Sequence, residues 1–205
     1  MTDRRPGSHL LAAGLSAAAL GLAGCAGPGP EWTEVDGRPC VTFRKTYQLH
    51  RMCSDRPAPE AAAVGEAMRL EPLPDAGLLW VHWLSRSGFT RPLDLSLDGQ
   101  RIAPLLPGGA VRLQVSPGQH RLAVECQGGL AEARVDVAAG DMRFMEVDGD
   151  PAFAAFACAW RPTDDRAGAA ARARSARLTA DVDVRGATMP RSDSVRPHPE
   201  NARTP

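Results

Sequence analysis

The stretch LLWVHWL, residues 78–84, decides the fold class because it is apolar on both faces. A strand of this kind is typical of the centre of a sheet that is covered on both sides. Trp80 and Trp83 point to opposite faces of such a strand, so one of them belongs to a core. We expect the other to be covered by the N-terminal segment or by the Arg-rich segment near the C-terminus. The alternative is an exposed aromatic platform that binds a ligand.

Downstream of this stretch the hydrophobic period becomes two. Apolar and polar side chains alternate in four segments, 93–98, 111–115, 121–126 and 133–137. Such alternation puts one face of a strand against a core and the other in water. Further strands are expected over 142–147 and 154–160. The pattern predicts an all-β domain over residues 77–160, an antiparallel β-sandwich of about seven or eight strands.

Turn chemistry separates these strands. Asp98-Gly99 is a hairpin signal, because glycine accepts a positive φ. Pro117-Gly118 fits the centre of a type II turn. His120 follows this turn, and we expect its ring to hydrogen-bond the hairpin backbone rather than to bind a ligand.

Residues 1–24 have the three parts of a signal peptide. Arg4 and Arg5 precede an uncharged stretch over 9–23, which at 15 residues is shorter than the ~20 that a transmembrane helix needs. Leu22-Ala23-Gly24-Cys25 then resembles a bacterial lipobox. The resemblance implies that Cys25 becomes the first residue and carries a diacylglycerol, usually with a third acyl chain on its amine. Two or three chains make membrane attachment effectively permanent.

The anchor places the protein in the cell envelope, facing the periplasm. Ala26 stands where an Asp tends to retain enterobacterial lipoproteins in the inner membrane, so the outer membrane is favoured. Residues 25–76 are read as a tether and an N-terminal segment. Within them we expect a small β element over 41–49 and one helix over 59–69.

Lipidation of Cys25 leaves four cysteines for disulfides, namely Cys40, Cys53, Cys126 and Cys158. An even number in an oxidising compartment suggests two bridges, and four cysteines allow three pairings. We favour Cys40–Cys53, which closes a local loop, and Cys126–Cys158, whose members share an inward-facing parity across the core. On the chain-entropy model each contributes roughly 3–4 kcal/mol. A metal or redox site is the alternative, but there is no CxxC spacing and no His beside a Cys.

Residues 161–205 differ sharply from the domain before them. They hold nine Arg and six acidic residues, and no aromatic residue follows Trp160. We read them as an Arg/Ala-rich tail, with a short helix capped by 163–165 and reaching Leu178, and with disorder beyond Asp181. A solvated tail is the plain interpretation. The alternative is weak contact with anionic headgroups or cell-wall polymer.

Three segments together resemble a PEGA-type repeat: 97–102 with its Asp-Gly turn, 115–124 with Pro-Gly-x-His, and 135–140. With a following strand over 142–147, residues 77–148 resemble an uncharacterised domain of small bacterial lipoproteins. The chain departs from that pattern in lacking the usual Pro after the Asp-Gly turn. The resemblance implies a non-catalytic β-sandwich on the cell envelope, a structural role for His120, and no catalytic residues.

The chain shows no GxSxG, HExxH or P-loop motif, so we expect neither an enzyme nor a cofactor or metal. Its 24 basic and 24 acidic residues balance, which gives no reason to expect nucleic acid. The sequence therefore predicts a lipid-anchored interaction or accessory module whose partners are the membrane and an envelope protein or cell-wall polymer. One alternative is a module that binds glycan or peptidoglycan fragments. Another is a small hydrolase with a site assembled from unlinked residues.

Overall fold

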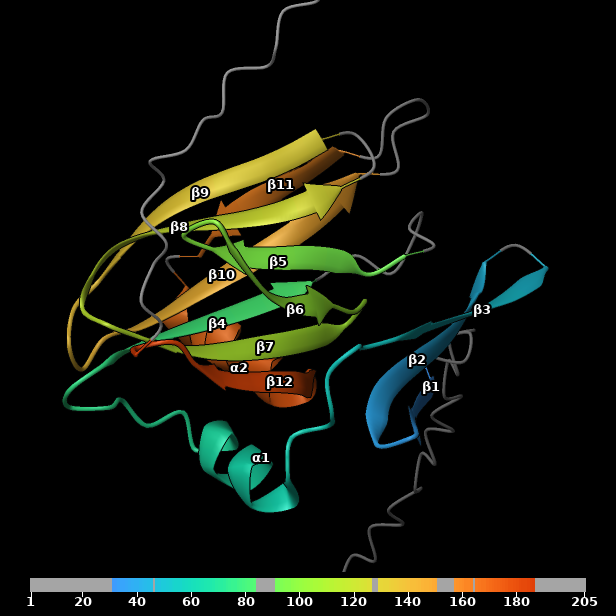
Figure 1. The fold of residues 1–205 in the computed structure, drawn as a ribbon, viewed down its shortest axis with the longest axis horizontal. Helices are drawn as coiled ribbons and strands as arrows, with labels where there is room; N and C mark the ends of the chain where they lie inside the picture. The colour runs from blue at the N-terminus through green and yellow to red at the C-terminus, as the bar shows by residue number, and fades with distance from the viewer. Residues whose placement is uncertain are drawn as a thin grey trace, which may run out of the picture.

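The fold is known from a computed structural model that describes residues 31–45, 47–83, 91–126, 129–150, 157–163 and 165–186. In these ranges the chain forms twelve strands and two helices, and the strands make three sheets (Figure 1). The prediction of a mainly β protein with antiparallel sheets is confirmed at this level. The predicted signal segment and Cys25 lie outside the described ranges.

The five-stranded sheet is built around the doubly apolar stretch 78–84. Its order is β11 (Ala157–Pro162), β10 (Met142–Asp150), β4 (Gly77–Trp83), β7 (Gly109–Val115) and β12 (Arg177–Asp183). β4 thus occupies the centre, as its two apolar faces predicted. The expectation of purely antiparallel pairing is wrong here, because β10 runs parallel to β4 and β12 runs parallel to β7. Period-two alternation indicates which face of a strand is buried, but it is the same for parallel and antiparallel strands.

The four-stranded sheet is antiparallel throughout. Its order is β6 (Gln100–Leu105), β5 (Leu93–Leu97), β8 (Gly118–Cys126) and β9 (Gly129–Val137). Figure 1 shows it in front of the five-stranded sheet. The main core takes side chains from both sheets, among them Leu79, Trp83, Leu95, Leu113 and Leu122, all but inaccessible to solvent.

Two helices cover the other face of the five-stranded sheet. They are α1 (Ala61–Met68) and α2 (Arg166–Ser175), and they bury a second cluster of apolar side chains around Trp80. Trp80 is 1% exposed and Trp83 is 0% exposed, so the expectation that both rings are covered is confirmed. The covering helices come from the N-terminal segment and the Arg-rich segment, which are the two segments expected to provide this cover.

A small antiparallel sheet of β1 (Glu31–Val35), β2 (Arg38–Lys45) and β3 (Gln48–Cys53) precedes α1. The expected single β element over 41–49 is wrong in its bounds, since one strand ends and the next begins inside that range. Val41 and Met52 join the main core, and Trp32 and Phe43 pack against it. The far end of the β2–β3 hairpin projects away from the two larger sheets (Figure 1).

The segment after residue 160 contributes regular elements to the fold. β11 continues to Pro162, the predicted helix ends at Ser175 rather than Leu178, and β12 adds an edge strand. Leu178 lies under the helices, whereas Ala180 reaches the main core. These two are the only buried apolar side chains of β12, so an Ala/Arg-rich composition concealed a strand that pairing with β7 stabilises. Residues 187–205 lie outside the described ranges.

Two glycines give opposite predictions for substitution by alanine. A Cβ at Gly77 would lie 2.2 Å from Val137 Cγ1 and 3.2 Å from Val115 Cγ2, inside the core. Gly77→Ala should therefore lower the free energy of unfolding by about 1–3 kcal/mol through overpacking. A Cβ at Gly65 in α1 meets nothing within 4 Å, so Gly65→Ala should raise it by up to about 1 kcal/mol. Urea unfolding of the two variants tests this, and shifts of the same sign would contradict it.

Candidate functional site

The predicted lipidation site, Cys25, lies outside the described residues, so the structure contributes no geometry for it. In the described ranges neither helix combines the length and apolar character required to cross a bilayer. The remaining sequence-predicted site residues are two cysteine pairs and a cluster at the Asp98-Gly99 turn. All of these are placed by the structure.

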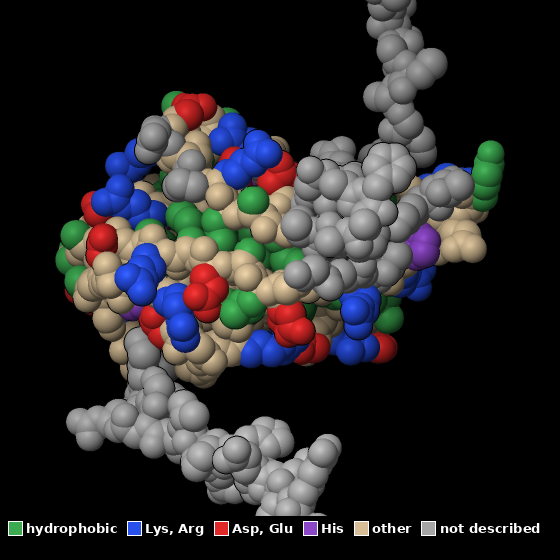
Figure 2. Space-filling model, turned by 90° about the horizontal axis from the view of Figure 1, so that it is seen from above, with side chains coloured by type: hydrophobic (Ala, Val, Ile, Leu, Met, Phe, Trp, Pro, Cys, Tyr) green, Lys and Arg blue, Asp and Glu red, His purple; other side chains and the backbone are tan. Residues whose placement is uncertain are grey.

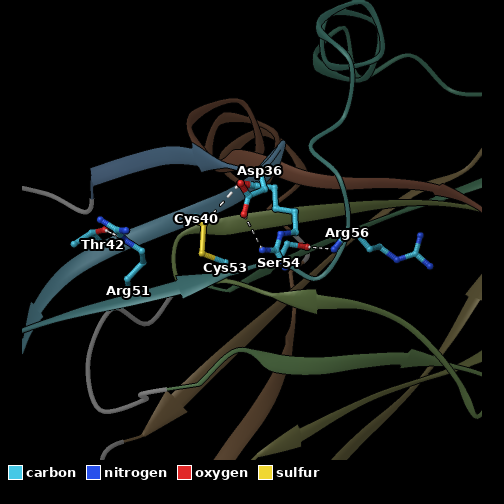
Figure 3. Close-up of a disulfide and its surroundings, with 8 residues drawn as sticks. Asp36, Cys40, Thr42, Arg51, Cys53, Ser54 and Arg56 are labelled. Carbon is cyan, nitrogen blue, oxygen red and sulfur yellow. Dashed lines mark hydrogen bonds and ion pairs between the residues drawn. A yellow bond between two sulfur atoms is a disulfide. The ribbon is translucent and has the colours of Figure 1, made fainter.

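The first cysteine pair joins β2 to β3. Cys40 and Cys53 lie directly opposite each other in the register and form a disulfide with a Cα–Cα distance of 4.0 Å (Figure 3). Just beyond it the Ser54 N–H donates to the Pro39 carbonyl at 2.9 Å, and Ser54 Oγ accepts from the Arg56 N–H at 3.0 Å. The bridge and these bonds fix the point where the hairpin leaves the body.

The second pair joins the two large sheets. Cys126 on β8 is bonded to Cys158 on β11, with a Cα–Cα distance of 6.1 Å and a sequence separation of 32. Nearby the Trp160 Nε1–H donates to the Ala131 carbonyl at 3.0 Å, a further link between β11 and β9. Both disulfides favoured from the sequence are the ones the structure contains.

Asp98 and His120 form a clamp where the chain passes between sheets. Asp98 and Gly99 have φ values of 53° and 85°, as a type I′ hairpin turn between β5 and β6 requires. The Asp98 carboxylate accepts from the Arg121 N–H at 2.7 Å and lies 2.8 Å from Nδ1 of the buried His120 ring. His120 Nε2 lies 2.7 Å from the Ser116 carbonyl, to which it donates.

The type II hairpin turn expected at Pro117-Gly118, next to this clamp, is not present. β7 belongs to the five-stranded sheet and β8 to the four-stranded sheet, so the two residues form a corner between sheets. Gly118 has a φ of 146°, not the value near +80° of a type II turn. The clamp also lacks the geometry of a Ser-His-Asp triad, since Nε2 faces the Ser116 carbonyl and Ser116 Oγ donates to the Arg185 carbonyl at 3.3 Å.

Asp98→Ala should weaken the fold through this clamp. The change removes the acceptor of the Arg121 N–H and one partner of the buried His120 ring. Leaving such groups unpaired costs about 1–3 kcal/mol of unfolding free energy. Asp136→Ala is the control, because its exposed carboxylate accepts only a 3.5 Å bond from Gln119, and its effect should stay within about 0.5 kcal/mol. Equal denaturation midpoints for the two variants would refute the clamp.

A pocket of about 320 Å³ lies between the end of β3 and the four-stranded sheet. Arg101 crosses it, with its guanidinium 2.7 Å from Asp55 and 2.6 Å from Asp94. Cys53 and Cys126, one member of each disulfide, also line it. The sequence did not predict this pocket, because its lining residues are far apart in the chain and no motif joins them. In the described ranges no group of three or more His, Cys, Asp or Glu side chains could hold a metal ion.

Two ion pairs that no sequence pattern predicted lie beneath the helices. Arg112 on β7 is 4% exposed and forms two hydrogen bonds to Asp181 on β12, at 2.8 and 2.6 Å. Burial lowers the pKa of Arg112, but its hydrogen bonds with Asp181 and the charge of that carboxylate outweigh this and hold the pKa above its ordinary value. Arg172 on α2 likewise bonds the buried Glu146 on β10.

The Arg-rich segment therefore has internal partners. Besides Arg172, Arg177 pairs with Glu34 on β1 at 2.8 Å, and Arg185 pairs with Asp183 at 2.7 Å. Figure 2 shows acidic and basic side chains interspersed over one face of the body. In the described part of this segment these three arginines pair with acidic side chains, whereas Arg166 and Arg174 are exposed.

Comparison with known proteins gives no family to which the chain can be assigned. No family model matches it, and no curated protein matches it. The function is therefore inferred from its own residues and geometry.

Proposed function

We propose that this protein is a lipid-anchored cell-envelope protein whose β domain is a non-enzymatic interaction or accessory module facing the periplasm. Cys25 carries the anchor, and the outer membrane is favoured over the inner membrane by Ala26. The partners are the membrane, through the lipid, and an envelope protein or cell-wall polymer. Nucleic acid is not among them.

The observation that carries this proposal is the pair of disulfides. All four cysteines downstream of Cys25 are bonded to one another. Structural disulfides persist in oxidising compartments such as the bacterial periplasm and are rare in the cytosol. Because the lipobox-like sequence independently indicates export, the two features support the same compartment.

The finer fold proposed for the module is a PEGA-like β-sandwich formed mainly by β4 to β11. Supporting it, the main core takes side chains from both large sheets. The Asp98-Gly99 turn and the strand that starts at Gly118 also fall where the resemblance expects them.

Binding of glycan or peptidoglycan fragments receives less support. That alternative relied on an exposed tryptophan face, whereas Trp80 and Trp83 are both buried. It also relied on the Arg-rich segment, in which Arg172, Arg177 and Arg185 pair with acidic side chains and Arg166 and Arg174 are exposed. The Asp98–His120 clamp gives the hydrolase alternative no poised nucleophile.

The anchor is tested by expressing Cys25→Ser beside the unchanged protein in a bacterial host. Mass spectrometry should find a diacylglycerol on Cys25 of the unchanged protein, which should sediment with membranes. Cys25→Ser should lack the lipid and should not be processed before residue 25. A Cys40→Ser/Cys53→Ser variant is the matched control and should keep the lipid. Normal processing and membrane attachment of Cys25→Ser would overturn the proposal.

A further inference from the structure

The free end of the β2–β3 hairpin carries exposed apolar side chains. In the described ranges only three large hydrophobic residues are strongly exposed, and two of them, Tyr47 at 92% and Leu49 at 66%, lie at this end. The third, Leu130 at 61%, lies on β9 of the four-stranded sheet. The hairpin end projects away from the body, and no helix or strand of the described residues covers it (Figure 1).

The same hairpin is basic. Residues 38–53 contain four Arg or Lys residues and no Asp or Glu. Arg44 pairs in register with Leu49, and Arg51 pairs with Thr42, so these residues share one face of the hairpin. Arg44 and Arg51 are both exposed, and neither is within ion-pair distance of an acidic side chain in the described part of the chain. The Arg51 Nε–H donates to the Thr42 hydroxyl at 3.5 Å.

The hairpin end also lies toward the start of β1, the first described strand after Cys25 in the chain. β1 pairs with β2 such that Glu31 lies opposite Thr42, three residues before the end of β2 at Lys45. The six residues from Cys25 to Glu31 span at most about 20 Å when extended. The three residues from Thr42 to Lys45 extend about 10 Å along the strand. An anchor at Cys25 therefore keeps Tyr47 and Leu49 within reach of the headgroup layer.

From this placement we infer that the end of the β2–β3 hairpin docks on the bilayer surface, with Tyr47 and Leu49 at the headgroup level and Arg44 and Arg51 facing anionic lipids. Tyrosine is enriched at this depth because its ring is apolar and its hydroxyl is wet. Each Arg near an anionic surface should strengthen the contact about fivefold. The contact rests on the proposed lipid anchor and goes beyond it, because it fixes the orientation of the domain and holds the two large sheets away from the bilayer.

The contact is tested on the full-length protein purified from membranes and reconstituted into vesicles. A fluorophore is attached to Tyr47→Cys, and to Leu130→Cys as the matched control, with the native cysteines left in their disulfides. The vesicles contain phosphatidylethanolamine and phosphatidylglycerol, with a quencher in the lipid or in the water. The label at 47 should be several-fold better protected from the aqueous quencher than the label at 130, and it should be quenched by the lipid-borne one. Equal accessibility at the two positions would overturn the contact.

The charge component is tested in the same assay. Adding Arg44→Gln and Arg51→Gln to the 47-labelled protein should reduce protection in anionic vesicles and change little in neutral phosphatidylcholine vesicles. Equal protection with and without these changes in anionic vesicles would overturn the role of the two arginines. A hairpin end that instead binds a protein would remain accessible to water in pure lipid vesicles, which also contradicts the proposal.

Failure of the anchor can be separated from failure of the hairpin contact. Mass spectrometry of the same sample reports whether Cys25 is acylated. An acylated protein with an accessible label at 47 overturns only the hairpin contact. An unacylated protein whose label at 47 becomes protected when vesicles are added supports the contact and refutes the anchor, and one whose label stays accessible refutes both.

Discussion

Replacing Arg112 with methionine is expected to lower the free energy of unfolding by about 3–5 kcal/mol. The guanidinium is buried beneath the helices, and its two hydrogen bonds to Asp181 join β7 to β12. Methionine fills part of the volume but leaves the Asp181 carboxylate, 12% exposed, without its partner. The loss is measured by urea unfolding of the oxidised protein, and β12 should become less protected from amide hydrogen exchange.

Two controls separate the buried pair from surface charge. Glu66 lies 3.7 Å from Arg112 but is 52% exposed, so Glu66→Gln should cost no more than about 1 kcal/mol. The double variant Arg112→Met/Asp181→Leu should regain most of the lost stability, because a buried ion pair can often be replaced by apolar residues at little cost. If the double variant is less stable than Arg112→Met, the stranded charge is not the cause.

Removing the Cys126–Cys158 disulfide by two alanine substitutions is expected to cost about 3–4 kcal/mol, since the bridge closes a loop with a sequence separation of 32. This bridge joins the four-stranded sheet to the five-stranded one at the side where Trp160 also bonds Ala131. Its loss should therefore lower the unfolding midpoint of the whole two-sheet body. Chemical denaturation with and without the substitutions measures the effect.

The Cys40–Cys53 bridge is the natural comparison. It closes a shorter loop, with a sequence separation of 13, and its removal should cost about 3 kcal/mol on the same model. Because it links adjacent strands of the small sheet, its loss should increase proteolysis of the β2–β3 hairpin before the body unfolds. If removing either bridge left both the unfolding midpoint and the proteolysis pattern unchanged, neither disulfide would stabilise the fold.

Prediction from the sequence succeeded where the type of a residue and its close neighbours in the chain indicate whether it is buried or lies in a turn. Leu93, Leu95 and Leu97 alternate with polar neighbours, and all three are buried in the core. The two apolar faces of residues 78–84 placed β4 at the centre of its sheet. Asp98-Gly99 specified a turn that needs positive φ at both positions, and both have it. The shared parity of Cys126 and Cys158 and the short loop between Cys40 and Cys53 also led to the two observed bridges.

Prediction failed where a residue depends on a partner far away in the chain. β12 has few apolar side chains and becomes a strand because it pairs with β7, which precedes it by about 60 residues. Arg112 looked like the polar half of an alternation, but its side is covered by helices, so it is buried against Asp181. The pocket crossed by Arg101 also gathers residues from several distant segments.

By itself, the sequence of this protein determined the local properties. They are the strands β4, β5 and β7 with parts of β8 and β9, the turn at Asp98-Gly99, the burial of both tryptophans, and a lipobox-like Cys25 that leaves an even set of cysteines. Only the tertiary structure decided strand direction, the place of β12, the buried Arg112–Asp181 pair and the projection of the β2–β3 hairpin. The reason is physical. Backbone preference and hydrophobic period depend on a few neighbouring residues, whereas sheet pairing and ion pairing depend on segments that are far away in the chain and adjacent only in the folded protein.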